Sequence, residues 1–179
     1  IKLGLENPKR LLKEYLAYPP HRTKVIHVAG TNGKGSTCAF IDSVARATGT
    51  RTGLFTSPHI IGLEERFRVG GVPVDRDEVI QHGLAVLDVF GVDDSSPRLT
   101  FFELTTLMAV RIFASHPEID VCIYEVGLGG RLDATNAIEP SLSVVTTIGL
   151  DHMAYLGDTI EAIAREKLAI SRPGVPLVV

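Results

Sequence analysis

The sequence predicts an α/β protein with a doubly wound, mainly parallel sheet, helices on both faces and a phosphate-binding P-loop. Short apolar runs alternate with helix-like segments, as expected of parallel strands joined by right-handed helical crossovers. The runs are rich in β-branched residues, which is typical of strands buried on both faces. A glycine-rich segment, residues 30–36, directly follows the first main run and precedes a helix pattern.

The elements follow in order along the chain. A first short helix is expected at residues 7–17, because Asn7-Pro8 is a helix-start signal and Pro19-Pro20 ends the pattern. The expected strands are residues 25–29, 52–55, 121–126, 142–147 and 175–179. The expected later helices are residues 36–48, 75–88, 100–115 and 159–170.

Helix caps and turn residues support these boundaries. Asp75 with Glu78 and Thr100 with Glu103 have the spacing of capping boxes, and Asp158 is expected to cap the last helix. Residues 60–74 break the alternation with several glycines, so we expect an excursion over the sheet, with edge-strand character at residues 66–69. Residues 91–98 are a polar, turn-rich loop.

Composition limits the possible functions. The chain has 179 residues, 45% hydrophobic residues and a formal net charge of -3. This favours neither nucleic acid nor membrane partners, and the chain has no apolar run long enough to span a bilayer. Cys38 and Cys122 have no CxxC spacing and suggest buried free thiols in a cytoplasmic protein. We expect one domain, residues 1–179, as a fragment of a longer protein.

The main chemical motif is Gly30-Thr31-Asn32-Gly33-Lys34-Gly35-Ser36. Glycines let backbone N–H groups converge on phosphate oxygens, and a helix N-terminus adds positive potential. The lysine can reach outer phosphates, and the serine hydroxyl can assist Mg²⁺. The spacing departs from GxxxxGK[ST], because a glycine separates the lysine from the serine. The alternative is a flexible glycine turn.

Three further loops follow predicted strands and are expected at the same sheet edge. Glu125 ends a hydrophobic strand, where a P-loop enzyme needs a Mg²⁺ ligand, although it could also be a solvated strand-end charge. Ser57 and His152 lie in the other two loops and could complete a magnesium shell or position substrate. A single histidine such as His152 is more often structural or solvated than a ligand.

Lys167 shares one predicted face of the last helix with Ile160 and Ile163, at positions i, i+3 and i+7. That face should be buried. The ammonium group could extend from an apolar stripe into solvent. Alternatively, a buried and partly neutral lysine could be chemically used or modified.

Together these residues make the chain resemble the folylpolyglutamate synthase and dihydrofolate synthase family of the Mur ligase superfamily, across nearly its whole length. The segments that carry the resemblance, in the family's order, are HVAGTNGKGST, LFTSPHI, ERFRVGG, LTFFE, YEVGLGGRLDATN, IGLDHMAYLGDT and IAREK. Peptidoglycan Mur ligases usually have threonine directly after the loop lysine, whereas Lys34-Gly35-Ser36 looks like the folate branch.

The resemblance implies a Mur ligase-like ATP-binding domain. In this family ATP phosphorylates the carboxylate of dihydropteroate or a reduced folate, and L-glutamate attacks the acyl phosphate. Thr31, Asn32, Gly33, Lys34, Gly35 and Ser36 would hold ATP. Ser57 and Glu125 would bind one Mg²⁺ and His152 a second, with Lys167 as the family's carbamylated lysine. Lys34, Glu125, His152 and Lys167 are the implied catalytic residues.

By the same resemblance, the pterin side would be held by Thr100, Phe102, Arg131, Leu132 and Asp133. Phe102 and Leu132 could equally be core residues. Lys2 stands where the family usually has an acidic residue, and Leu168-Ala169 replaces Ala-Gly.

The implied protein is a monomer that acts on small molecules. The glutamate ligase domain would be absent here, so we expect this fragment alone to be inactive. The alternatives are a Mur-type peptidoglycan ligase and a non-catalytic nucleotide-binding P-loop module.

Overall fold

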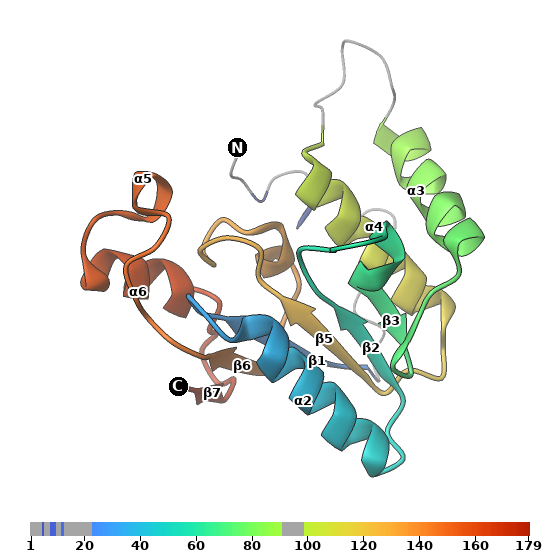
Figure 1. Ribbon diagram of the computed structural model, residues 1–179, viewed down its shortest axis with the longest axis horizontal. Helices are drawn as coiled ribbons and strands as arrows, with labels where there is room; N and C mark the ends of the chain where they lie inside the picture. Colours follow the sequence, from blue (N-terminus) through green and yellow to red (C-terminus); the bar gives the residue numbers. More distant parts are fainter. Residues whose placement is uncertain (1–4, 6–7, 10–11, 13–22, 91–98) are drawn as a thin grey trace.

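The computed structural model describes residues 5, 8, 9, 12, 23–90 and 99–179, and it contains one seven-stranded sheet (Figure 1). The strands are β1 (Lys24–Ala29), β2 (Thr52–Phe55), β3 (Phe67–Val69), β4 (Val72–Pro73), β5 (Val121–Glu125), β6 (Leu142–Val145) and β7 (Leu177–Val178). The α-helices are α2 (Lys34–Ala47), α3 (Arg76–Phe90), α4 (Phe101–Ser115), α5 (Met153–Leu156) and α6 (Ile160–Leu168). Two 3₁₀ helices are η2 (Leu63–Arg66) and η3 (Ala134–Ala137).

The strand order is β4-β3-β2-β5-β1-β6-β7, and β1 lies between β5 and β6. The pairs β1–β5, β1–β6, β2–β5 and β6–β7 are parallel, while β2–β3 and β3–β4 are antiparallel. Val28 is opposite Glu125 in the register, so the loops after β1 and β5 leave the sheet at the same level. The predicted mainly parallel sheet is confirmed, and its carboxyl edge carries the glycine loop.

Helices cover both faces of this sheet. On one face, α2 buries Cys38 against Val28, Leu54 and Ile123. On the other face, α3 and α4 pack together over a larger core that includes Phe55. Figure 1 shows α2 running across one side of the sheet and α3 beside α4 on the other. Alternate residues of the central strands therefore face different helices, which explains their nearly continuous hydrophobicity.

Residues 60–74 confirm one prediction and correct another, because β3 matches the strand expected at residues 66–69 but the excursion over the sheet is not seen. They do not run over the sheet but extend it, because η2 leads into β3, which pairs with β2, and into β4 at the edge. Pro73 fits such an edge position, since proline cannot donate to a further strand. The predicted strands at residues 142–147 and 175–179 are also shorter in the structure. The predicted helix at residues 7–17 falls largely outside the described residues.

Of the predicted helix caps, the Thr100–Glu103 capping box is present, whereas the box expected between Asp75 and Glu78 and the Asp158 cap are not seen. Thr100 Oγ1 accepts from the Glu103 N–H at 3.1 Å and the Glu103 carboxylate accepts from the Thr100 N–H at 2.7 Å, which confirms the capping box. Asp75 Oδ1 accepts from the Asp77 N–H at 2.8 Å. The last helix is capped by Thr159 and not by Asp158, because α6 begins one residue later than that cap requires.

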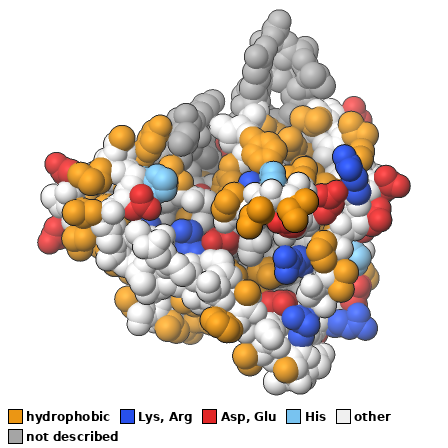
Figure 2. All heavy atoms as spheres, viewed as in Figure 1, with side chains coloured by type: hydrophobic (Ala, Val, Ile, Leu, Met, Phe, Trp, Pro, Cys, Tyr) orange, Lys and Arg blue, Asp and Glu red, His pale blue; other side chains and the backbone are white. Residues whose placement is uncertain are grey.

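The surface shows no dominant charge on the face in Figure 2, where acidic, basic and hydrophobic side chains are interspersed. Both cysteines are buried, as predicted. Within the part of the chain that the structure describes, no helix combines the length and apolar character needed to cross a membrane.

Candidate functional site

The loop after β1 converges on one backbone oxygen. Lys34 Nζ donates to the Gly30 carbonyl at 3.0 Å and to the Thr31 carbonyl at 3.2 Å. Lys167 Nζ donates to the same Gly30 carbonyl at 2.9 Å. Gly30 has φ 154° and packs so closely against Thr146 that a β-carbon would collide with that side chain. The glycine therefore permits the close approach of two loops.

The loop after β6 is tied to the glycine loop by paired hydrogen bonds. Thr31 donates through Oγ1 to the Gly149 carbonyl at 3.1 Å and accepts from the Gly149 N–H at 2.9 Å. Thr146 Oγ1 donates to the Asn32 carbonyl at 2.6 Å, and the Asn32 N–H bonds to Thr147 Oγ1 at 3.0 Å. These contacts hold the glycine loop open toward the start of α2, whose first N–H groups have no partners within the helix.

Glu125 lies where the strands β1, β2 and β5 end. Its side chain is buried, and its Oε2 accepts from the Ser57 N–H at 2.8 Å. Burial raises the pKa of this carboxyl, while the Ser57 N–H, Lys34 and Arg66 act in the opposite direction. A buried carboxylate that faces cationic groups and the first turn of α2 is suited to hold a divalent cation.

Lys167 is buried as the helical spacing predicts, with 3% of its surface exposed. Ile163 on the same face is fully buried, but Ile160 is 45% exposed, so the prediction for Ile160 is wrong. Ile160 is the first residue of α6, and the buried residues of this helix begin at Ile163. Burial lowers the pKa of Lys167, and the nearby Lys34 lowers it further. A lysine with a lowered pKa is a better nucleophile because more of it is neutral.

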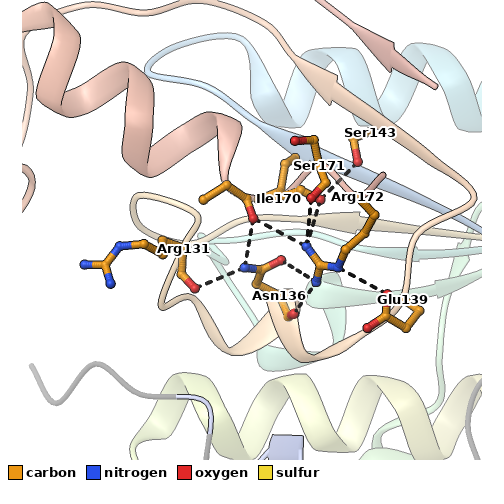
Figure 3. Close-up of polar contacts among 8 residues, drawn as sticks. Arg131, Asn136, Glu139, Ser143, Ile170, Ser171 and Arg172 are labelled. Atoms are coloured by element: carbon orange, nitrogen blue, oxygen red, sulfur yellow. Dashed lines mark hydrogen bonds and ion pairs between the residues drawn. The ribbon is translucent and has the colours of Figure 1, made fainter. Parts of the chain in front are cut away.

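The end of α6 is held by Arg172 (Figure 3). Its guanidinium donates to the carbonyls of Ala169, Ile170 and Ser171, and to both the carbonyl and the side-chain oxygen of Asn136. Asn136 in turn donates to the Ala169 carbonyl at 3.3 Å and to the Arg131 carbonyl at 3.0 Å. This network connects η3 to the helix that carries Lys167.

A cavity of about 570 Å³ opens beside these loops. The predicted site residues among its lining are Lys34, Ser57, Thr100, Phe102, Leu132, Asp133 and His152. Lys34, the one phosphate-loop residue in this lining, therefore shares the cavity with residues of the predicted pterin group. Glu125, Arg131 and Lys167 are not part of this lining. Phe102 also packs against Phe55 at 5.9 Å between ring centroids, so it serves both the core and the cavity.

Asp133 and Arg131 are both bonded to other residues of the protein. Asp133 is buried and accepts from the N–H groups of Gly127, Leu128 and Thr135 and from the Thr135 hydroxyl, so its carboxylate shapes the loop after β5. Burial raises its pKa, and these hydrogen bonds oppose that change. Arg131 forms an ion pair with Glu166 at 2.8 Å.

His152 lies at the start of α5 with φ 48°, in the left-handed region that non-glycine residues seldom adopt. Its side chain is 56% exposed and its Nε2 lies 3.6 Å from Asp151. It lines the cavity on the side of the β6 loop. Among the described residues, no three His, Cys, Asp or Glu side chains gather closely enough to hold a metal ion. A metal here therefore needs oxygen atoms from serine, from a ligand or from a modified lysine.

Sequence reasoning did not identify several lining residues, above all Arg66, with Pro58 and Leu128. Arg66 is only 7% exposed. Its place at the end of a charged run, directly before Phe67 in an alternating segment, was the available signal. Its neighbours in space come from other segments, so the sequence spacing alone gave no role.

The chain matches the Mur ligase middle domain family over residues 28–173. It is 44% identical to a dihydrofolate synthase/folylpolyglutamate synthase of Bacillus subtilis, over 99% of this chain and 42% of that protein. It is 46% identical to a folylpolyglutamate synthase of Arabidopsis thaliana, over 87% of this chain and 28% of that protein.

Solved structures agree with these matches. The FolC protein of E. coli in complex with DHPP and ADP has a TM-score of 0.91 and 41% identity, over 99% of this chain and 41% of that one. A bifunctional folylpolyglutamate synthase/dihydrofolate synthase with Mn, AMPPNP and L-glutamate bound has a TM-score of 0.88 and 40% identity, over 99% of this chain and 42% of that one. This chain spans less than half the length of these relatives. The chain belongs to the Mur ligase middle domain family, in its folylpolyglutamate synthase and dihydrofolate synthase branch.

Proposed function

We propose that the protein containing this chain is an ATP-dependent ligase that adds L-glutamate to dihydropteroate, to reduced folates or to both. The chain supplies the ATP-binding domain and most of the acceptor site, acting as a cytoplasmic monomer on small molecules. The observation that carries the proposal is the shared cavity, in which Lys34 of the glycine loop and Phe102 of α4 line one space. A phosphoryl group and an aromatic acceptor could meet there.

ATP would bind through residues 31–36. The first N–H groups of α2 and the Lys34 ammonium would surround its outer phosphates, and positive potential at the helix N-terminus favours the same anion. Lys34 would exchange its internal contacts with Gly30 and Thr31 for phosphate oxygens. This exchange is favourable because the ammonium group replaces neutral carbonyl acceptors with charged phosphate oxygens.

A divalent cation would bind beside Glu125. Its buried carboxylate and the Ser57 hydroxyl are hard oxygen donors of the kind Mg²⁺ prefers, and phosphate oxygens would complete the shell. Gly35 leaves this space free, because a β-carbon there would lie 3.4 Å from Glu125 Oε1. A second ion would need His152 and a carbamylated Lys167. When bound, the two ions would neutralise charge that develops on the transferred phosphoryl group.

The residues of this chain would carry out the remaining tasks. Phe102, Thr100 and Leu132 would bind the pterin-bearing end of the acceptor, and Asp133 would keep the loop after β5 in shape for it. Lys34 would hold the γ-phosphoryl group in line with the acceptor carboxylate. Phosphorylation turns an inert carboxylate into an acyl phosphate, which the amino group of glutamate can attack with loss of phosphate.

The test measures ADP release by the intact protein with Mg-ATP, L-glutamate and either dihydropteroate or a reduced folate. We expect release only when all substrates are present, with an amide-linked glutamate product detected by mass spectrometry. Glu125→Gln should lower turnover by about 10²-fold or more, since it removes charge from the metal site. Glu161→Gln, at an exposed position on α6, is the matched control.

Absence of turnover with both acceptors would falsify the folate assignment. Turnover with a peptidoglycan precursor instead would identify a Mur-type ligase. Binding of ATP without any acceptor-dependent release would indicate a non-catalytic P-loop module.

A further inference from the structure

Arg66 is a buried cation that forms no ion pair within the part of the chain that the structure describes. Its Nε donates to His59 Nδ1 at 2.8 Å, and its guanidinium carbon lies 5.3 Å from the centroid of the Phe101 ring. Within residues 23–90 and 99–179, no carboxylate lies within 4.0 Å of it, and its buried Nη1 has no hydrogen-bond partner. The guanidinium therefore contacts His59 and Phe101, while its Nη1 has no partner among the described residues.

Such an arrangement destabilises the folded protein. A buried charge without a partner typically costs several kcal/mol, and arginine does not lose its proton at physiological pH. Burial lowers the pKa of Arg66, while Glu125 acts in the opposite direction. The planar fork of N–H groups matches the geometry of a carboxylate or a phosphate, which it can bind through two parallel hydrogen bonds. An anionic ligand would remove the cost.

The position of Arg66 indicates which anion. It lines the same cavity as Phe101 and Phe102 on one side and Lys34 and Ser57 on the other. It thus stands between an aromatic wall and the polar end at the glycine loop. An elongated acceptor with an aromatic body would bring its terminal carboxylate to this junction, next to the lysine that holds the transferring phosphate.

We propose that Arg66 binds the reacting carboxylate of the acceptor substrate through its guanidinium group and holds it beside Lys34. The inference rests on the proposed function, because it takes the acceptor to occupy this cavity. His59 and Phe101 orient the guanidinium, one by accepting at Nδ1 and the other through its ring face. Arg66 would therefore distinguish an acid from an equally shaped neutral molecule.

The experiment compares two ligands of the intact protein in the presence of ADP: dihydropteroate and its analogue with a carboxamide in place of the carboxylate. Calorimetry measures each dissociation constant for the natural protein and for Arg66→Gln. We expect Arg66→Gln to weaken binding of the acid by about 10- to 100-fold, as for loss of a hydrogen bond to a charged group. Binding of the carboxamide and of ADP should stay the same.

Two further variants test the interpretation. Arg66→Lys keeps the charge but loses the fork, so its affinity for the acid should lie between the other two. Arg68→Gln, two residues along in β3 and outside the cavity lining, should bind both ligands normally. Thermal unfolding of each variant checks that it folds.

Three results overturn the inference. Equal weakening of acid and carboxamide would show a structural role for Arg66. Weakened ADP binding with normal acid binding would assign Arg66 to the nucleotide. If the natural protein binds neither pterin ligand, the proposed function itself fails, and the inference with it.

Discussion

Lys34 and Lys167 donate hydrogen bonds to one acceptor, the carbonyl oxygen of Gly30, at 3.0 and 2.9 Å. Two ammonium groups that share one carbonyl repel each other, and burial adds to the cost of the second charge. Burial is the main reason why the pKa of Lys167 lies below its ordinary value, and the charge of Lys34 lowers it further. The neutral amine needed to add carbon dioxide is therefore more available at Lys167 than at a surface lysine.

Lys167→Met should lower activity without lowering stability. Methionine has a similar volume, so we expect unfolding temperature to stay the same or rise, because one of two like charges is lost. Ligation should fall by about 10²-fold or more, since the carbamate proposed here cannot form. Activity assays and thermal unfolding of the intact protein measure both effects. Bicarbonate should not restore activity.

We also expect the stability difference between Lys167→Met and the natural protein to depend on pH. A lysine whose pKa is lowered in the folded state binds fewer protons there than in the unfolded state, so it destabilises the fold below its ordinary pKa of 10.5. The stability gap between Lys167→Met and the natural protein should narrow as pH rises toward that value. Lys24→Met, at an exposed position on β1, should show no such narrowing. Full activity in Lys167→Met would rule out the carbamate.

Gly35→Ala tests whether the space beside Glu125 must stay open. The new β-carbon would lie 3.4 Å from Glu125 Oε1, an ordinary contact, so the fold should tolerate it. Alanine in a helix is favoured over glycine by up to about 1 kcal/mol, so stability should not fall. Affinity for Mg-ATP should drop, by about tenfold or more, because the methyl group occupies the proposed cation space.

Calorimetric titration with AMPPNP and Mg²⁺ measures this change. Gly83→Ala is the matched control, since it adds a methyl group to α3 beside Met108 and far from the glycine loop. Unchanged nucleotide affinity in Gly35→Ala would show that the metal and phosphates lie elsewhere.

Arg172→Met should destabilise the end of α6. The guanidinium carries hydrogen bonds to four backbone carbonyls and to the Asn136 side chain, and methionine removes all of them. The Ala169 and Ile170 carbonyls keep hydrogen bonds from Asn136 and Ser143. We expect a loss of roughly 2 kcal/mol in unfolding free energy, measured by urea titration. Arg165→Met, at an exposed position of α6, should change it by less than about 0.5 kcal/mol. Equal effects would mean that the network contributes little.

Local signals in the sequence predicted the elements that depend on neighbouring residues. The Thr100 capping box and the bounds of β2 are correct, because caps and burial on both faces leave a pattern within a few residues. The pairing of β3 with β2 could not be predicted in this way, because it joins separate segments. Short apolar runs near the sheet edge also end earlier than hydrophobicity suggests, as in β7.

In the candidate site, too, features with a local sequence signal were predicted, and features that depend on distant residues were not. The glycine loop was visible because strand, loop and helix are contiguous in the chain. Burial of Lys167 followed from helical spacing, but its contact with Gly30 crosses the fold and had no sequence signal. Arg66 was missed for that reason too, since its burial depends on Phe101 from another helix.

The burial of His27 in the central strand β1 should make the stability of the fold sensitive to acid. It is almost fully buried in β1, its Nε2 lies 2.7 Å from Thr135 Oγ1, and its Nδ1 has no partner among the described residues. Burial, aided by the charge of Arg172, lowers its pKa from 6.5 to about 3. The folded state therefore binds fewer protons than the unfolded state in this window, so stability should fall as pH drops from 6.5 toward 3.

A pKa difference of one corresponds to about 1.4 kcal/mol, so this loss amounts to several kcal/mol. His27→Gln should be less stable than the natural protein at pH 7, because the new side chain fits the site less well. The difference should shrink or reverse by pH 4, since glutamine does not titrate. Urea unfolding across this range measures it, with His116→Gln as a control at a half-exposed position. A stability difference that stays constant with pH would mean that His27 does not titrate in the unfolding transition.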